Sequence, residues 1–289
     1  MKVVALMYHD VVPAGQEESS GFAGADAARY KVTPEQFGAH LHAIRARVAR
    51  APGTSVMLAT SSFPIAGGFG RAGSAGVRTA PANTPLMLTF DDGGRSAGRI
   101  ADALEHHGWR GHFFVTTSRI GGPGFLQRGT IRDLHRRGHV IGSHSETHPL
   151  RMSHCTEARL RDEWHRSIAT LGDVVGEGIT CASVPGGYNS DLVVRTAADA
   201  GARFLFTSQP TSRAHRVGDM WVIGRYVLLR STSAAVAAAI AAGDLTPRLR
   251  QAAAWNVKGV CKRLGGTRYL WVRERILGRS SPTLSEDAS

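Results

Sequence analysis

Cysteine is scarce in this chain of 289 residues: Cys155, Cys181 and Cys261 are far apart and form no C-x-x-C pair. Such a set does not build a disulfide framework, and it is typical of a reducing compartment. Long apolar runs are also missing, because no window approaches 18 apolar residues without charge. The apolar start of the chain is cut off by His9 and Asp10, which is too early for a secretory signal. We therefore predict a cytoplasmic protein without a membrane span.

Acidic residues are also few, with 23 Asp and Glu against 35 Lys and Arg and a formal net charge of +12. Residues 246–279 hold nine Lys or Arg and one acid, so this segment carries about two-thirds of the excess. The basic character belongs to the tail, and aromatic residues do not interleave with it as a nucleic-acid-stacking surface requires. We therefore predict no nucleic-acid partner. The 42% hydrophobic content is that of a globular protein, and the length suits one α/β barrel.

Strand-like and helix-like patterns alternate along the chain. Thr33-Pro34-Glu35-Gln36 starts a helix with a capping box, and residues 156–175 form a long amphipathic one. Short apolar runs predict strands at 2–8, 85–90, 112–115, 140–141, 180–184 and 203–207, with one or two more in 220–230. This alternation indicates βα units around a parallel sheet. Two long segments rich in Gly, Ala and Ser, 13–31 and 51–84, read as loops.

An acidic pair follows the apolar run 85–90, in the sequence Thr89-Phe90-Asp91-Asp92-Gly93. Parallel α/β folds place their active sites at the carboxyl ends of strands, which is where this pair falls. Neighbouring residues of an extended segment point in opposite directions, so the two carboxylates are expected to have different roles. The alternative is an Asp-Asp-Gly turn that only ends the strand.

A histidine pair follows another predicted strand, in His144-Ser145-Glu146-Thr147-His148. A spacing of four places both imidazoles on one side of a helical turn. Two imidazoles and one carboxylate are a common ligand set for a catalytic zinc with an open fourth position. Because both clusters follow strands, they are expected at the same face of the sheet. This coincidence favours a metal site over two solvated loops.

Together, these two clusters resemble, in order and separation, the first two signature motifs of the polysaccharide deacetylases, the NodB-homology or carbohydrate esterase 4 family. Pro185-Gly186-Gly187-Tyr188 lies where the third motif of that family, Arg-x-Pro and an aromatic, is expected. The resemblance covers roughly residues 1–230. It implies a distorted (β/α)7-type barrel of the NodB-homology fold over 1–230. Residues 231–289 would be a basic helical C-terminal extension with a disordered end.

The resemblance also implies residue roles. Asp91 would be the general base, and Asp92, His144 and His148 would hold a divalent metal, usually zinc in this family. The oxyanion of the tetrahedral intermediate would lie near a backbone N–H just after Pro185, most simply that of Gly186. Tyr188 would either pack on a sugar face or belong to the core.

Two departures from the family pattern stand out. Ser183 occupies the position of the third-motif arginine that orients the base, and Arg225 or Arg95 are candidate substitutes. The C-terminal Leu-x-His motif that supplies the general acid is absent, since Leu228-Leu229-Arg230 has no histidine. Leu6-Met7-Tyr8-His9 looks like that motif moved to the N-terminus, as in the similar, permuted poly-N-acetylglucosamine deacetylases. We therefore predict His9 as the general acid.

The basic tail has two interpretations. Apolar residues recur at helical spacing over residues 246–264, among them Leu249, Val257, Val260 and Leu264. They would either cap the barrel, burying these side chains, or form an interfacial helix. In the second case residues 246–279 would hold the protein peripherally at the inner membrane surface, near a lipid-linked glycan.

Three functions remain open. The leading prediction is a metal-dependent hydrolase that removes an N-acetyl group from an N-acetylated sugar in polysaccharide or glycoconjugate biosynthesis. An O-deacetylase, a deformylase or a deacetylase of a small sugar-containing metabolite would use the same fold. A degenerate, non-catalytic glycan-binding relative is the third, because the third-motif arginine is missing.

Overall fold

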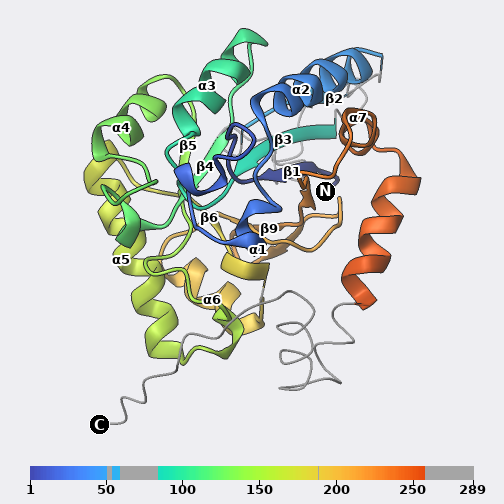
Figure 1. Ribbon diagram of the computed structural model, residues 1–289. Coiled ribbons are helices and arrows are strands. Elements are labelled where there is room, and N and C mark those ends of the chain that lie inside the picture. Colours follow the sequence, from blue (N-terminus) through green and yellow to red (C-terminus); the bar gives the residue numbers. More distant parts are fainter. Residues whose placement is uncertain (51–53, 59–83, 188, 258–289) are drawn as a thin grey trace, which may run out of the picture.

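The computed structural model describes residues 1–50, 54–58, 84–187 and 189–257. Its strands form one ten-stranded sheet that curls into a partial barrel with helices packed around it (Figure 1). The strands are β1 (Val4–Tyr8), β2 (Thr54–Val56), β3 (Thr84–Phe90), β4 (His112–Val115), β5 (Val140–Ser143), β6 (Cys181–Ser183), β7 (Phe204–Phe206), β8 (His215–Val217), β9 (Met220–Ile223) and β10 (Tyr226–Val227). The α-helices are α1 (Ala25–Ala28), α2 (Pro34–Val48), α3 (Ala97–His106), α4 (Arg128–Arg136), α5 (Glu157–Val175), α6 (Asp191–Asp199) and α7 (Ala234–Ala241).

The strand order along the sheet is β10-β1-β3-β4-β5-β6-β7-β9-β8, and β2 pairs with β3 off this path. All of these pairings are parallel except that of β8 with β9. The carboxyl ends of the parallel strands therefore share one edge of the sheet. The predicted α/β barrel architecture is confirmed. The sequence reading missed β2, inside the segment taken as a loop, and the short antiparallel strand β8.

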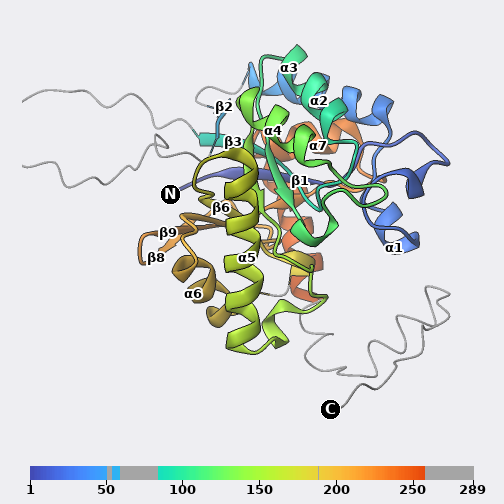
Figure 2. The same cartoon turned by 90° about the vertical axis from the view of Figure 1, so that its left-hand side faces the viewer.

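The strands β1, β3, β4, β6 and β7 are buried on both faces, which explains why their sequences are apolar runs without alternation. One set of side chains in β1, including Val4, Leu6 and Tyr8, packs with α2, α3 and α7 in the largest core cluster. Ala5, on the opposite face of β1, packs in a separate core cluster together with Val3, Met87 and Phe114. Figure 2 shows α4 and α5 covering the outer face near β5, with which both are in contact.

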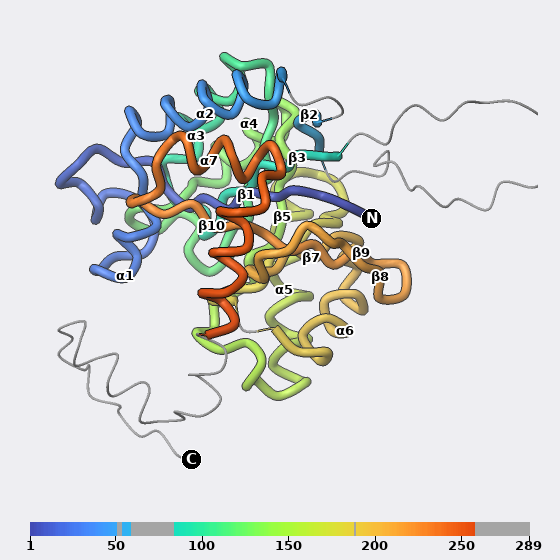
Figure 3. Tube along the Cα trace, turned by 90° about the vertical axis from the view of Figure 1, so that its right-hand side faces the viewer, coloured from blue at the N-terminus to red at the C-terminus, as the bar shows by residue number. Residues whose placement is uncertain are grey.

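The start of α2 is capped as predicted. Thr33 Oγ1 accepts a hydrogen bond from the N–H of Gln36 at 3.2 Å, and Gln36 Oε1 accepts one from the N–H of Thr33 at 3.0 Å. The Gln36 side chain also donates to the carbonyl of Arg230 at 3.0 Å. The cap therefore joins the first helix-turn of α2 to the segment between β10 and α7, and α7 packs along α2 (Figure 3).

A further helix over residues 245–257 lies beside β10 (Figure 3). Arg248 Nε donates to the hydroxyl of Tyr226 at 2.8 Å, so the helix is fixed to the barrel. The capping interpretation of the tail is nevertheless wrong in its details: Leu249 and Val257 are 63% and 62% exposed, because the polar face of the helix is the one that contacts the sheet. Val260 and Leu264 lie outside the described residues.

Within the described ranges, no helix has the length and apolar character needed to cross a membrane. Peripheral membrane contact through residues 246–279 stays a prediction.

Candidate active site

Strand ends bring the predicted site residues together. Asp91 and Asp92 follow β3, His144 follows β5, and His9 follows β1. These parallel strands end at the same edge of the sheet. The active-site residues expected from the sequence therefore lie on neighbouring loops although they are far apart in the chain.

Asp92, His144 and His148 form a compact cluster of possible metal ligands, with one ligand atom from each lying within 4.8 Å of the others. Oδ1 of Asp92 is 3.4 Å from Nε2 of His144 and 3.6 Å from Nε2 of His148. In the part of the chain that the structure describes, no other three Asp, Glu, His or Cys side chains meet in this way. Two imidazole nitrogens and one carboxylate oxygen are a donor set suited to zinc.

The histidine pair does not lie on a helical turn, so that detail of the sequence reading is wrong. Residues 144–148 form a bend, in which Ser145 and His148 have φ of 63° and 59°. Asp92 is also left-handed, with φ of 77°. Such a backbone costs roughly 1–2 kcal/mol for an L residue. The strain therefore falls on two of the three residues whose side chains converge.

Ser183 orients His144. Nδ1 of His144 lies 2.5 Å from Oγ of Ser183 and 3.2 Å from its carbonyl oxygen. This engages Nδ1 with the protein and leaves Nε2 facing Asp92, which is the arrangement by which a second residue fixes a metal-binding imidazole. Ser183 Oγ donates in turn to Oδ1 of Asp91 at 3.3 Å. The residue that replaces the arginine of the third motif thus links His144 to Asp91.

Arg225 forms a bidentate ion pair with Asp91. Its Nη1 and Nη2 donate to Oδ1 and Oδ2 of Asp91 at 2.6 and 2.7 Å. Both side chains are buried, and the guanidinium also donates to the carbonyl of Thr207 and the hydroxyl of Thr89, each at 3.2 Å. The structure thus places Arg225 beside the candidate base, whereas Arg95 donates to the carbonyl of Ser19.

The electrostatics of the site favour ionised carboxylates. Burial alone raises the pKa of Asp91, but the charges of Arg225 and His144 outweigh it and hold the pKa below its usual range. Burial also raises the pKa of Asp92. The neighbouring His9, His144 and His148 outweigh burial and hold this pKa well below its usual range. Burial and the neighbouring His144 lower the pKa of His148 to about 4. A neutral imidazole beside two carboxylates is ready to bind a cation.

His9 lies close enough to the acidic pair for its charge to lower the pKa of both Asp91 and Asp92. Its ring packs against Tyr30, with 4.6 Å between the ring centroids. Nδ1 of His9 is buried and has no hydrogen-bond partner among the described residues. The structure thus brings the predicted general acid to the site with an unsatisfied ring nitrogen.

The third-motif segment follows β6. Pro185 is buried, and the next two residues, Gly186 and Gly187, have φ of 62° and 70°. Only glycine takes two such conformations in succession without strain. Tyr188, the predicted aromatic contact, lies outside the described residues.

Residues 79–205 match the sequence profile of the family described as polysaccharide deacetylase. Over this range, somewhat less than half of the chain, the protein is similar to polysaccharide deacetylases. The matched residues include Asp91, Asp92, His144 and His148, whereas His9 and Arg225 lie outside them.

Two solved structures share the fold of this chain. IcaB from Ammonifex degensii is 20% identical with a TM-score of 0.63, over 83% of this chain and 97% of that one. The deacetylase PplD from Streptococcus pyogenes, solved in complex with acetate, is 18% identical with a TM-score of 0.60, over 81% and 95%. An uncharacterised 30.6 kDa protein from Geobacillus stearothermophilus is 26% identical over 132 residues, 44% of this chain. The match covers 48% of that relative, so the chain spans about half its length.

Sequence reasoning missed one wall of this candidate site, which is formed by the loop before α2. Phe22 packs on His148, with 4.7 Å between ring centroids, and the guanidinium of Arg119 lies 5.5 Å from the Phe22 ring. Buried Lys31 holds this loop by donating to the carbonyls of Glu17, Ser20 and Phe22 at 2.5–2.7 Å. The composition of residues 13–31 reads as a loop, and no local pattern indicates that it is fixed over the histidine.

Asp10 also holds this loop, through a hydrogen bond to Ser20. Its Oδ1 accepts hydrogen bonds from the hydroxyls of Ser20 and Ser96, both at 2.6 Å. Burial, and then the charge of Asp92, raise the pKa of Asp10, while the hydroxyl hydrogen bonds lower it in part. Asp10 follows directly after His9, and it thereby ties the end of β1 to the loops around the site.

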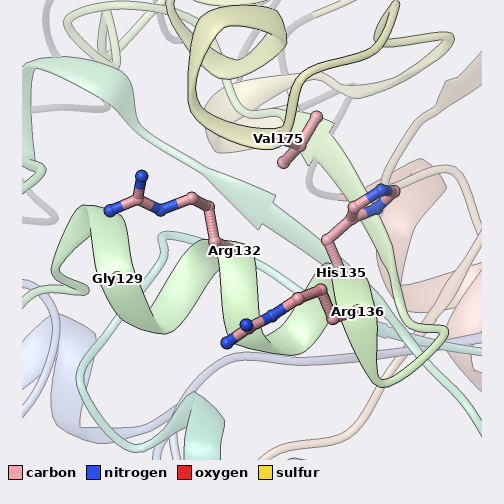
Figure 4. A pocket seen from close by; sticks show the side chains of 5 residues that line it. All are labelled: Gly129, Arg132, His135, Arg136 and Val175. Atoms are coloured by element: carbon pink, nitrogen blue, oxygen red, sulfur yellow. The ribbon is translucent and has the colours of Figure 1, made fainter.

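A surface depression at α4 is separate from these residues. It is lined by Gly129, Arg132, His135 and Arg136 of α4 and by Val175 at the end of α5 (Figure 4). None of its lining residues takes part in the Asp–His cluster.

Proposed function

We propose that this protein is a metal-dependent hydrolase that removes an N-acetyl group from an N-acetylated sugar during polysaccharide or glycoconjugate biosynthesis. The observation that carries the proposal is the juxtaposition of two sites. A three-ligand cluster of Asp92, His144 and His148 stands beside a second carboxylate, Asp91, that is not needed as a ligand. A metal-dependent hydrolase of this kind uses the ligand cluster to hold its metal and the second carboxylate to accept a proton from water.

Asp92, His144 and His148 would hold the metal, for which their nitrogen and oxygen donors favour zinc. A divalent ion bound there supplies Lewis acidity for the water and for the acetamide carbonyl. The fit rests on the residues: Nδ1 of His144 is engaged by Ser183, and burial favours the neutral, coordinating form of His148.

Asp91 is the proposed general base that accepts a proton from the attacking water. Arg225 keeps its carboxylate ionised and aligned, at the cost of lower basicity. The N–H of Gly186 would donate to the developing oxyanion, and the left-handed turn after Pro185 supports this role because it carries no side chain that blocks approach. His9 would donate a proton to the leaving nitrogen as the C–N bond breaks. The products are acetate and the free amino sugar.

The Arg225–Asp91 pair weakens the case for a degenerate relative. That alternative rested on serine at the position of the third-motif arginine, and here a guanidinium reaches the base from the loop between β9 and β10. The compartment remains the cytoplasm predicted from the cysteine pattern, and the division of the chain at residue 230 also remains a prediction.

The test is product analysis with purified protein loaded with Zn²⁺. Oligomers of N-acetylglucosamine are compared with O-acetylated and N-formylated sugars, and both released acid and new free amine are measured. Equal amounts of acetate and amine from the N-acetylated substrate, abolished by a chelator and restored by Zn²⁺, are the expected result. Acid release without amine would favour the O-deacetylase, and no turnover of any substrate by metal-loaded protein would favour a binding role.

A further inference from the structure

The turn that follows β6 has little packing of its own. Gly186 and Gly187 both lie in the left-handed region, and neither has a side chain to hold the turn in place. Glycine is the residue with the greatest backbone freedom. If the N–H of Gly186 donates to an oxyanion, as the proposed function requires, neighbouring groups must hold this turn still. An oxyanion donor acts through being positioned before the reaction.

Two neighbours close on Gly187 from outside the turn. A methyl group on Gly187 would lie 3.0 Å from Cη2 of Trp255, 3.0 Å from Cβ of Ser208 and 3.2 Å from its Oγ. At these distances a side chain on Gly187 would force Ser208 or the indole ring to shift, so the tip of the ring lies close to the glycine. Ser208 comes from the segment after β7, whereas Trp255 comes from the helix over 245–257.

That helix is fixed to the barrel by the same face that carries Trp255. Arg248, Gln251 and Trp255 are spaced by three and four residues, which places them in a row along one side of a helix. Gln251 accepts from the N–H of Val227 at 3.2 Å and donates to its carbonyl at 2.9 Å. Arg248 donates to Tyr226 and to the carbonyl of Gly243. The anchors on β10 thus set the position of the ring two turns beyond Arg248.

We propose that Trp255 is a positioning residue that braces the Gly186–Gly187 turn, and that the helix over 245–257 is consequently part of the catalytic unit. The role of the turn in catalysis rests on the proposed function, but the brace itself does not. Because the tail would act by holding a backbone donor, its loss should lower kcat while substrate affinity and metal content stay close to wild type.

The test compares Trp255→Ala with three other variants in the full-length, Zn²⁺-loaded protein. Leu249→Ala is the matched control, since this residue is exposed on another face of the same helix. Trp255→Phe keeps part of the ring. Gln251→Ala loosens the helix from β10 without touching the turn. The readouts are hydrogen exchange at the backbone amides of Gly186 and Gly187, metal content, and kcat and KM on an N-acetylglucosamine oligomer.

Trp255→Ala is expected to speed exchange at the turn and to lower kcat about 10–100-fold, less than the roughly 10²–10³-fold that follows loss of an oxyanion donor. Trp255→Phe and Gln251→Ala should show smaller changes of the same kind, and Leu249→Ala none. Should Trp255→Ala fail to fold, Trp255→Phe and Gln251→Ala provide the test in its place.

Wild-type-like exchange and kcat in Trp255→Ala would overturn the inference, and so would a rise in KM alone, which would mean that the ring contacts substrate instead. Faster exchange at the turn in Trp255→Ala, together with a wild type that deacetylates no sugar, would support the positioning role of Trp255 and refute the proposed function.

Discussion

Removing Arg225 should destabilise the protein far more than removing a surface arginine, and by an amount that depends on pH. Its guanidinium is fully buried and makes two short hydrogen bonds to the equally buried Asp91. Taking away one member of such a pair leaves an uncompensated charge and costs about 3–5 kcal/mol. In a chain of this size that corresponds to a fall in Tm of roughly 6–20 °C. We therefore expect Arg225→Met to fall in this range at pH 7.

The sign of the pH effect follows from the pKa of Asp91. In the wild type this pKa is below the unfolded value, so the carboxylate adds stability that is lost as the pH falls through the native pKa. Without Arg225, burial dominates and the native pKa rises. The variant's native state then binds more protons, and the stability gap between the two proteins widens as the pH rises through the two pKa values. The gap should be largest near neutral pH and smaller near pH 3.

The assay is urea unfolding in the presence of a chelator, at several pH values. Arg136→Met is the control, because Arg136 is exposed and its pair with Asp133 is expected to contribute less than about 1 kcal/mol. Arg225→Met/Asp91→Asn removes both charges and should be less destabilised than Arg225→Met alone at pH 7. If the double variant is the less stable of the two, or if Arg225→Met behaves like Arg136→Met, the ion-pair reasoning is refuted.

Three further predictions concern the remaining site residues. The protein should bind about one equivalent of Zn²⁺ by elemental analysis, and His144→Ala/His148→Ala should lose it; full retention by this double variant would remove the metal site. Asp91→Asn should abolish turnover while metal content is unchanged, because it removes a proton acceptor and no ligand; residual activity near wild type would exclude Asp91 as the base. His9→Ala should lower kcat by about 10²–10⁴-fold, as loss of a general acid does; a wild-type rate would show that another group protonates the amine.

The site residues that can be predicted from the sequence are those that come directly after a strand, because the strand fixes their position at one edge of the sheet. Asp91 and Asp92 come after an apolar run, and His144 after another, so a parallel sheet was enough to bring them together. The capping box at Thr33 was readable for the same reason: its signal is local.

The parts that could not be predicted depend on contacts without a local signature. Arg225 reaches Asp91 across 134 residues of sequence, and no local pattern decides between Arg225 and the other candidate, Arg95. A spacing of four residues between His144 and His148 is compatible with a helical turn and with a bend, so the sequence does not distinguish the two. The left-handed backbone of Ser145 and His148 shows that the segment is a bend. Trp255 at Gly187 is of the same kind, since helical periodicity shows which residues share a face but not which strand that face meets.

The pairing of β1 has a consequence for the order in which the barrel can be completed during synthesis. β1 lies between β3 and β10 and is hydrogen-bonded to both, with Leu6 opposite Leu88 on one side and Tyr226 on the other. At 5–20 residues per second, β10 leaves the ribosome roughly 10–45 s after β1. During that interval an apolar strand at the start of the chain has one unsatisfied edge, which is open to pairing with other chains. The two residues of β10 close it, and Gln251 then occupies the N–H and carbonyl of Val227 on the far side. A chain that stops before β10 would therefore be expected to aggregate through the open edge of β1.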